Sequence, residues 1–459
     1  MYAQRSRDNI DPTERSLMDS LTNSPSAAGS LSGKLVFPAD RFDRLTHYAF
    51  RYPAKFHPPV VRALIERYSK RGDVCLDPFN GSGTLQVEAM TLGRNSVGFD
   101  IDPLAVFVSE AKTRVHDVEK LAVRSDEILS AIKKLRELNP KNDQHLLNDI
   151  PDQAFNDIVL REGLSVPQIP KIKHWFRNIC ILQLARIKKV IDGLAFDSHQ
   201  KGFFLLCFAS IIRNSSNADP TPVSGLEVTA HMRRLEAEGR KIDVLSLFEK
   251  AVRTNLLGAK AFSVAAHQGT WANSEVRDAR RAAFPPVSVD VVITSPPYHN
   301  AVDYYRRHQL EMFWLGLANS AKERQDLLPG YIGRHNVPQA LKFEQTPALP
   351  TVAGHWERVM RDVKPRRADD FLHYFWSMSA VFGQLNTLLP KGGKAVFVVG
   401  NSQFQGEQIP TTDIFQEMAA GRFSHVETLW YPIKNRYMSY KRRNGADIDT
   451  EYVLVFSNR

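Results

Sequence analysis

The sequence predicts a doubly wound α/β fold with a mostly parallel sheet, interrupted by a large helical insert. A short apolar strand at 74–76, a glycine-containing turn and a helical pattern at 85–90 form the unit that opens many α/β domains. A second short strand at 96–99 ends in an acidic turn, and a third apolar strand covers 291–294. Residues 111–266, between the second and third strands, are rich in helical patterns and indicate the insert, with helices expected at 122–135, 179–191 and 203–212.

The turn after the first strand carries the first chemical signal. It reads Asp77-Pro78-Phe79-Asn80-Gly81-Ser82-Gly83-Thr84. This spacing is neither GxGxxG nor GxxxxGK[ST], which disfavours both nicotinamide-dependent hydride transfer and ATP hydrolysis. An acid at the end of the second strand is suited to bind ribose hydroxyls, and we predict that role for Asp100. Asp102 is expected to cap the following helix or to support Asp100.

The third strand leads directly into a second chemical signal. This segment reads Ser295-Pro296-Pro297-Tyr298. The exocyclic amino group of a base is a weak nucleophile because its lone pair is delocalised, so a catalyst must accept hydrogen bonds from its N–H groups. The Ser295 hydroxyl and the Pro296 carbonyl can do so, held in a stiff loop by the prolines. Tyr298 offers a ring face to an extruded base. The alternative interpretation is a rigid turn after a strand.

Together, the two segments resemble the S-adenosylmethionine-dependent DNA amino-methyltransferases. In that family a DPFxGSGT segment binds the cofactor and an [SND]PP[YFW] segment holds the target amino group. The resemblance extends to the segments 52–59, 300–308, 388–400 and 451–456. It implies a Rossmann-like methyltransferase domain. The TSPPY form is most similar to the cytosine-N4 enzymes, whereas adenine-N6 enzymes more often carry DPPY.

The resemblance also implies a set of site residues. Those expected to bind S-adenosylmethionine are Phe56, Asp77, Pro78, Phe79, Gly81, Ser82, Gly83, Thr84, Asp100, Ile101 and Asp278. Those expected to act in catalysis are Ser295, Pro296, Pro297 and Tyr298. The implied reaction is direct transfer of a methyl group to the N4 amino group of a cytosine flipped out of double-stranded DNA.

The order of these segments divides the chain into six expected parts. They are a disordered tail (1–34), a cofactor-binding half (35–110), a helical insert that is a candidate for target recognition (111–266), a catalytic half (267–317), a basic loop insertion that is a candidate DNA contact (318–369), and the remainder of the methyltransferase domain (370–459). The cofactor segment precedes the catalytic one, which excludes the family's beta arrangement and leaves alpha and gamma open. A structural cap on the sheet is the alternative role for the insert.

Three groups of cations are candidate DNA contacts. Arg213 and Asn214 follow an apolar helix, where they reach a phosphate or base edge or else cap the helix. A loop-like region holds Arg334, His335, Arg358, Arg361, Lys364, Arg366 and Arg367. The third group, 434–443, alternates aromatic and cationic residues and is either a nucleic-acid surface or a solvated hairpin.

The composition fits an enzyme of nucleic acids in the cytoplasm of a prokaryote. The chain has 60 Lys and Arg against 50 Asp and Glu, a net charge of +10, which weakly favours a polyanionic partner. Its three cysteines lack the Pro-Cys and CxxC patterns, which disfavours cytosine-C5 chemistry and points to structural thiols. The histidines show no metal-ligand spacing, and no apolar run is long enough for a membrane span or forms a signal peptide.

Other functions stay open at this point. An adenine-N6 DNA methyltransferase would use the same loop with a different base pocket, and an RNA base methyltransferase would share the chemistry. A catalytically inactive DNA-binding protein on the same fold is the non-enzymatic alternative. A cognate restriction or defence-system protein is a possible partner.

Overall fold

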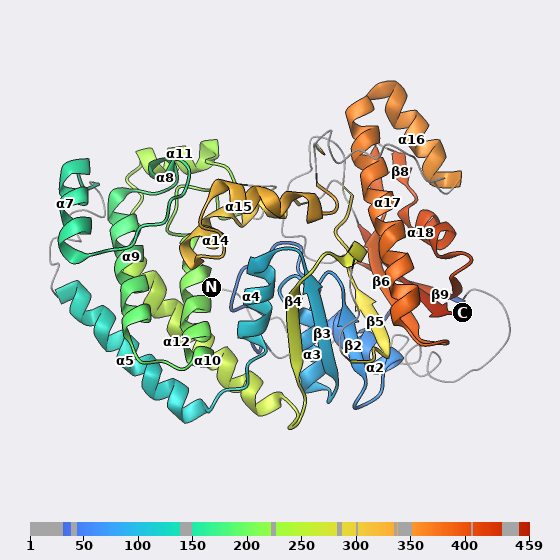
Figure 1. The fold of residues 1–459 in the computed structure, drawn as a ribbon, viewed down its shortest axis with the longest axis horizontal. Coiled ribbons are helices and arrows are strands. Elements are labelled where there is room, and N and C mark those ends of the chain that lie inside the picture. Colours follow the sequence, from blue (N-terminus) through green and yellow to red (C-terminus); the bar gives the residue numbers. More distant parts are fainter. Residues whose placement is uncertain are drawn as a thin grey trace, which may run out of the picture.

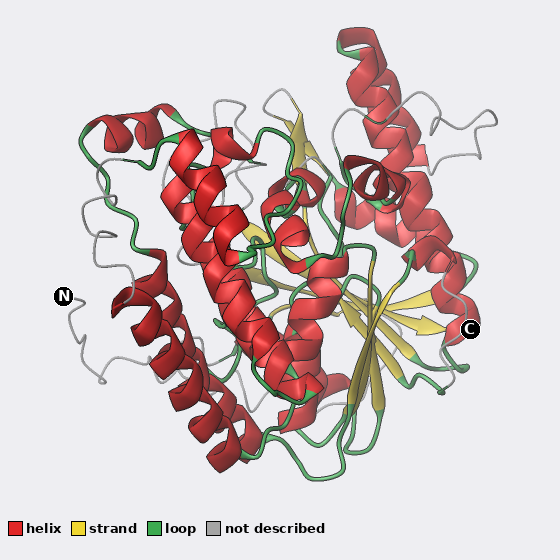
Figure 2. Cartoon of the chain, turned by 60° about the vertical axis from the view of Figure 1, so that its left-hand side comes forward, coloured by secondary structure: helices red, strands yellow, loops and turns green. Residues whose placement is uncertain are grey.

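A central sheet of eight strands organises the computed structural model (Figures 1 and 2). The structure describes residues 31–37, 44–137, 149–221, 226–281, 287–299, 302–334, 337, 351–404, 407–433 and 449–459. The strand order is β1-β9-β10-β6-β5-β2-β3-β4. The strands are β1 (Leu31–Lys34), β2 (Val74–Asp77), β3 (Asn95–Asp100), β4 (Ala272–Val276), β5 (Val291–Thr294), β6 (Lys394–Gly400), β9 (Phe423–Pro432) and β10 (Thr450–Asn458), while β7 (Ser402–Phe404) and β8 (Glu407–Ile409) form a separate pair.

The described helices of the first half of the chain are α2 (Pro58–Tyr68), α3 (Thr84–Thr91), α4 (Pro103–Lys112), α5 (Val118–Glu137), α7 (Asp152–Glu162), α8 (Ile172–Trp175), α9 (Asn178–Gly193), α10 (Ser198–Ile212), α11 (Ala230–Ala237) and α12 (Val244–Ala265). Among them, α3, α5, α9 and α10 correspond to the helices that the sequence predicts at 85–90, 122–135, 179–191 and 203–212. The second half contains α13 (Tyr304–Arg307), α14 (Gln309–Leu315), α15 (Ala321–Asp326), α16 (Thr351–Val363), α17 (Pro365–Leu388) and α18 (Thr411–Ala419).

The sheet is mostly parallel and doubly wound, which confirms the predicted fold class. Strands β4, β3, β2, β5 and β6 are parallel, and β10 is antiparallel to both of its neighbours. The chain builds outward from β2 to β3 and β4 on one side, and from β5 to β6 on the other. The order therefore reverses between β2 and β5, and ligands of such sheets bind at the carboxyl ends of the strands at this point.

Helices cover both faces of the sheet because the parallel strands are apolar on both sides. Alternate residues such as Cys75 and Val291 pack with α2 and α3 on one face. Their neighbours Leu76 and Val292 belong to the core under α17 and α18 on the other face. All three cysteines, Cys75, Cys180 and Cys207, are buried free thiols, as predicted.

The helices between α4 and β4 form a block with a core of its own, on the left of Figure 1. Its centre is made by buried side chains of α5, α9, α10 and α12. Three residues of α14, Leu310, Phe313 and Trp314, join the same core although they follow β5 in the chain. Helix α10 also packs on α4, and α12 on α3. The helical block is thus continuous with the sheet domain in packing.

Two of the expected boundaries are wrong. Residues 31–34, placed at the end of the expected tail, form β1, which pairs in parallel with β9; residues 1–30 lie outside the described part. A four-residue strand specified by its partner's backbone leaves little pattern in the sequence. The expected basic loop contains α16 and the start of α17. Its Ala353, Trp356 and Met360 are buried at helical spacing, a signal that the density of cations obscured.

Candidate active site

Asp77 links the turn after β2 to the end of β5. Its Oδ1 accepts a hydrogen bond from the Phe79 backbone N–H at 3.0 Å and another from the Thr294 hydroxyl at 2.6 Å. The residue is buried, and burial raises the pKa of its carboxyl group to about 7. The structure thus brings the two segments singled out in the sequence together at the point where the strand order reverses.

The turn itself holds an unusual backbone conformation. Gly81 and Gly83 have φ angles of 49° and 71°, in the left-handed region that favours glycine. A Cβ atom on Gly83 would lie 2.1 Å from the Ser109 hydroxyl oxygen, so no side chain fits there. Lys112 is fully buried beneath the turn and donates a hydrogen bond to the Ser82 carbonyl. Pro78 and Thr84 are buried at the two ends of the turn, and Phe79 packs against the core under α17.

A buried polar network, missed in the sequence, supports the turn from below. The Asn80 side-chain nitrogen donates to the Ser109 hydroxyl at 2.8 Å and to Gln86 Oε1 at 3.1 Å. The Ser274 hydroxyl donates to the same Gln86 oxygen at 2.9 Å, which ties α3 to β4. The available signal was Gln86, a polar residue between the apolar residues Leu85 and Val87 on a short helix that is buried along most of its length.

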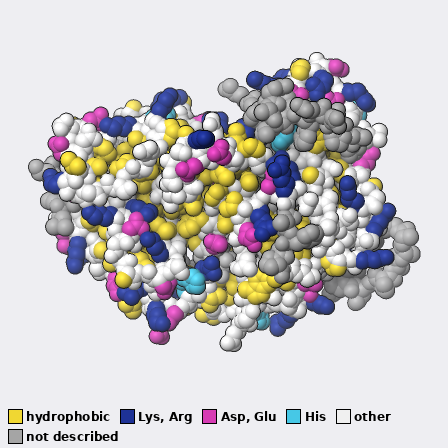
Figure 3. Space-filling view, viewed as in Figure 1, with side chains coloured by type: hydrophobic (Ala, Val, Ile, Leu, Met, Phe, Trp, Pro, Cys, Tyr) yellow, Lys and Arg dark blue, Asp and Glu magenta, His cyan; other side chains and the backbone are white. Residues whose placement is uncertain are grey.

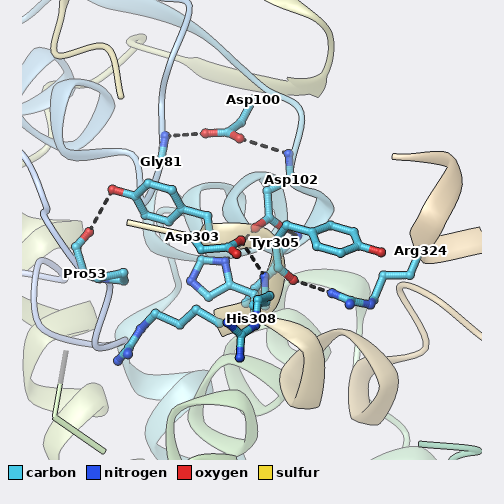
Figure 4. Close-up of polar contacts among 12 residues, drawn as sticks. Pro53, Gly81, Asp100, Asp102, Asp303, Tyr305, His308 and Arg324 are labelled. Carbon is cyan, nitrogen blue, oxygen red and sulfur yellow. Dashed lines mark hydrogen bonds and ion pairs between the residues drawn. The ribbon is translucent and has the colours of Figure 1, made fainter. Parts of the chain in front are cut away.

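The carboxylate of Asp100 connects the turn to the end of β3 (Figure 4). Its Oδ2 accepts from the Gly81 N–H at 2.8 Å and its Oδ1 from the Asp102 N–H at 2.9 Å. Burial, together with the nearby charge of Asp102, raises the pKa of Asp100 to about 7. Asp102 caps α4 by accepting from the Leu104 N–H at 2.9 Å, which confirms its predicted capping role. Its other oxygen lies 2.6 Å from Nδ1 of the buried His308.

Tyr52, and not the predicted Phe56, is the aromatic residue of the N-terminal segment that lies against the turn. A Cβ atom on Gly81 would be 3.2 Å from its ring. Tyr52 stacks on Tyr304 with ring centroids 5.6 Å apart and lies 5.0 Å from His308. Phe56 packs instead against the core of α2 and α3. Both residues belong to the same motif, so sequence position alone did not distinguish them.

Asp278 lies beyond the end of β4, on the same edge of the sheet as Asp100. Its carboxylate pairs with Arg280 at 2.7 Å, and Arg280 donates to the Pro329 carbonyl, also at 2.7 Å. The backbone N–H of Arg277 donates to the Asp100 carbonyl at 2.9 Å. The predicted adenosine-binding acid is therefore placed near the predicted ribose-binding acid.

The predicted catalytic loop, 295–298, is held by a carboxylate from the last strand. Tyr298 donates to Glu451 Oε1 at 2.7 Å, and Tyr431 donates to the other oxygen of Glu451. Burial and the charge of Glu451 raise the pKa of Tyr298 well above its ordinary value, so its hydroxyl stays protonated. Ser295, half-buried, hydrogen-bonds to the same Tyr298 hydroxyl. Pro296 is buried, whereas Pro297 is partly exposed.

The structure shows different surroundings for the residues of the predicted cation groups. Arg213 is buried and donates to the backbone carbonyls of Asp219 and Arg307, at 3.0 and 3.1 Å, which disfavours a phosphate contact; neither carbonyl belongs to α10, the helix that it was expected to cap. Arg361 is paired with Glu357 and Asp369. His335 and the group 434–443 lie outside the described residues. Lys and Arg side chains are scattered over the face seen in Figure 3.

Comparisons with known proteins agree with these motifs. A family model described as DNA methylase (N6_N4_Mtase) matches residues 21–110. The type II methyltransferase M.MvaI of Kocuria varians is 23% identical over 90% of this chain and 91% of its own length. M.BsoBI of Geobacillus stearothermophilus is 24% identical over 84% and 80% of the two chains. M.MjaII of Methanocaldococcus jannaschii is 40% identical, but over 16% and 14%.

Among solved structures, the rRNA methyltransferase AviRa from Streptomyces viridochromogenes is 11% identical, with a TM-score of 0.30 over 88% and 86% of the two chains. The order and direction of the strands identify the fold. None of the helices in the described ranges is both long and apolar enough to cross a membrane. The same ranges contain no cluster of His, Cys, Asp or Glu side chains suited to a metal ion.

Proposed function

We propose that this chain is a type II enzyme of the N4/N6 family of DNA amino-methyltransferases, and that it methylates the N4 amino group of cytosine in double-stranded DNA. S-adenosylmethionine is the methyl donor of this family. The choice of cytosine depends on the Thr294-Ser295-Pro296-Pro297-Tyr298 form of the catalytic loop. We expect such an enzyme to act in the cytoplasm of a prokaryote, with a cognate restriction or defence-system protein as its partner.

The residues at the carboxyl edge of the sheet fit the cofactor. When bound, S-adenosylmethionine supplies an electrophilic methyl group on a positively charged sulfonium, and it also carries an ammonium group. Asp77 and Asp100 are acids whose pKa values burial raises to about 7, so a cationic ligand would relieve the cost of their ionisation. Gly81 and Gly83 leave the backbone of the turn free of Cβ atoms. We assign the methionine part to this turn, the ribose to Asp100, and the adenine to the region between Ile101 and Asp278.

The hydrogen bond between Thr294 and Asp77 is the observation that carries the proposal. It joins the catalytic loop directly to the turn that is proposed to bind the cofactor, so donor and acceptor sites share one edge of the sheet. The Ser295 hydroxyl uses its proton toward Tyr298, which itself donates to Glu451. The lone pairs of Ser295 are then available to accept from the target amino group, together with the Pro296 carbonyl. Tyr298 keeps its role as the proposed stacking surface for the flipped base.

Methylation of unmodified DNA tests the proposal. The purified protein is incubated with DNA and labelled S-adenosylmethionine, and the DNA is digested to nucleosides that mass spectrometry identifies. N4-methylcytosine is the expected product. N6-methyladenine would keep the mechanism and correct the base, and label in RNA alone would replace the substrate. Cofactor binding without label in any nucleic acid would support the non-enzymatic alternative.

A further inference from the structure

Residues 327–334, called here the crossing segment, run between the helical block and α17 across the carboxyl edge of the sheet. Leu327 packs against the cluster formed by α4, α10 and α14. Ile332 is buried in the other core, with Trp356 and Phe371 of α16 and α17. Just beyond the segment, the Val337 N–H donates to Asp370 Oδ1 of α17 at 2.9 Å. The crossing segment is thus anchored in two apolar clusters, that of α4, α10 and α14 and that under α17.

Between these anchors the crossing segment contacts residues that follow three strands. The Pro329 carbonyl accepts from Arg280, which follows β4 and pairs with Asp278. Gly330 lies against Ile101, which follows β3, and Gly333 lies against the Pro297-Tyr298 part of the catalytic loop after β5. One short stretch of backbone therefore contacts both the proposed adenosine region and the catalytic loop.

Two glycines make these contacts possible. A Cβ atom on Gly330 would lie 2.3 Å from Ile101 Cγ1 and 2.5 Å from its Cδ1, distances that force a displacement. Gly333 has a φ angle of +79°, and a Cβ atom there would be 3.1 Å from the Tyr298 carbonyl oxygen. The first contact involves a side chain of the cofactor region, and the second involves the backbone of the catalytic loop.

We propose that Gly330 and Gly333 are positioning residues, through which the crossing segment sets the cofactor region and the catalytic loop at a fixed distance from each other. This inference rests on the proposed function. Methyl transfer requires the methyl carbon and the target nitrogen in line and in contact, and small misplacements of bound reactants slow a reaction strongly. The two glycines act on different sides of that geometry, so their substitution has different consequences.

The test compares Gly330→Ala and Gly333→Ala with two matched controls. Gly354→Ala, on α16, adds a Cβ atom that meets nothing within 4 Å, and Gly269→Ala does the same at a φ angle of +84°, which matches Gly333. For each variant, calorimetry gives the Kd for S-adenosylmethionine, and a single turnover at saturating cofactor gives the rate of methyl transfer. Circular dichroism verifies folding.

Gly330→Ala is expected to raise the Kd at least tenfold and to change the saturated rate less than threefold. Gly333→Ala is expected to lower the rate at least tenfold with a Kd within threefold. Adding Ile101→Ala to Gly330→Ala removes the colliding atoms, so the double variant should bind within threefold of Ile101→Ala alone. The inference would be overturned if the two variants behaved like the controls. It would also be overturned if each variant changed the Kd and the rate by similar factors.

The positioning role of the two glycines can still be tested if the proposed function is wrong. A wild-type protein that binds S-adenosylmethionine and methylates no nucleic acid refutes the function, while the Kd values of Gly330→Ala and its Ile101→Ala partner still test the cofactor side. For the catalytic side, hydrogen exchange at the Tyr298 and His299 amides should accelerate at least fivefold in Gly333→Ala and stay unchanged in Gly269→Ala. Unchanged exchange in both variants would overturn this half of the inference.

Discussion

At the scale of single residues, the buried charge of Asp77 is expected to lower the stability of the folded protein while it strengthens cofactor binding. Its Oδ1 accepts two hydrogen bonds that an asparagine oxygen can also accept, so Asp77→Asn removes the buried charge and keeps the contacts. We expect the variant to be more stable by about 1–3 kcal/mol at pH 8 and to bind S-adenosylmethionine at least tenfold more weakly. Urea unfolding and calorimetry measure the two effects.

The pH dependence of this effect follows from the direction of the shift. The carboxyl group has a pKa of about 7 in the folded protein, against an ordinary value of 3.8. Between these values the folded state binds more protons, so ionisation of Asp77 costs stability as the pH rises and the full cost is reached above about pH 7. The gain from Asp77→Asn should therefore shrink from pH 8 to pH 5. An equal gain at both values would show that the buried charge is not its source.

Ser295 offers the second prediction at this scale. Ser295→Ala removes one proposed acceptor for the amino group and the hydrogen bond to Tyr298, and leaves the Thr294–Asp77 contact in place. The rate of methyl transfer should fall about 10- to 100-fold, as expected for one hydrogen bond made in the transition state. The Kd for the cofactor should change less than threefold. Rate and affinity falling together would move Ser295 to a cofactor-binding role.

At the scale of elements, the amino end of α17 is a candidate DNA contact within the expected basic loop (318–369). Lys364 and Arg366 are exposed there. The double variant Lys364→Ala/Arg366→Ala should weaken DNA binding and reduce the slope of log K against log salt by about 1 to 2, since each phosphate contact contributes close to one. Fluorescence anisotropy over a salt series measures both.

A cation on the helical block serves as the control for that experiment. Arg124 on α5 is paired with Glu127 at 2.7 Å, and Arg124→Ala should leave the salt slope unchanged. If Arg124→Ala reduces the slope and the α17 variant does not, the helical block becomes the DNA-binding element. That result would favour the insert as the site of target recognition.

The elements that precede and follow the motifs could be predicted, because glycine and proline turns interrupt short apolar runs there. The contacts that complete the site could not. Asp102 and His308 are 206 positions apart, and Tyr298 and Glu451 are 153 positions apart. Each pair depends on the order of strands in the sheet, which no local pattern specifies. Tyr52 and Phe56 show that contacts between nearby segments are also hard to predict. Their motif contains two aromatic residues, and only packing decides which one faces the turn.

At the scale of the whole molecule, the packing does not divide the chain at the limits of the helical insert. The insert begins and ends in sequence near 111 and 266, yet its core includes Trp314 of α14, which lies near Phe176 and Phe208 with ring centroids 6.1 and 6.0 Å apart. Sequence order showed where the insert interrupts the sheet domain. It gave no sign that a helix after the catalytic loop would return to complete the insert's core.

This shared core leads to a prediction about cooperativity. Trp314→Ala removes a side chain that is only 3% exposed and should cost about 3–5 kcal/mol. If the helical block and the sheet unfold as one unit, the urea transition stays single and amide exchange accelerates in both α9 and β6. Phe382→Ala, which removes a ring stacked on Phe397 at 4.7 Å in the other core, should give the same pattern. Acceleration confined to 118–265 after Trp314→Ala would mean that the block opens alone, and α14 would then be a hinge between two separately stable parts.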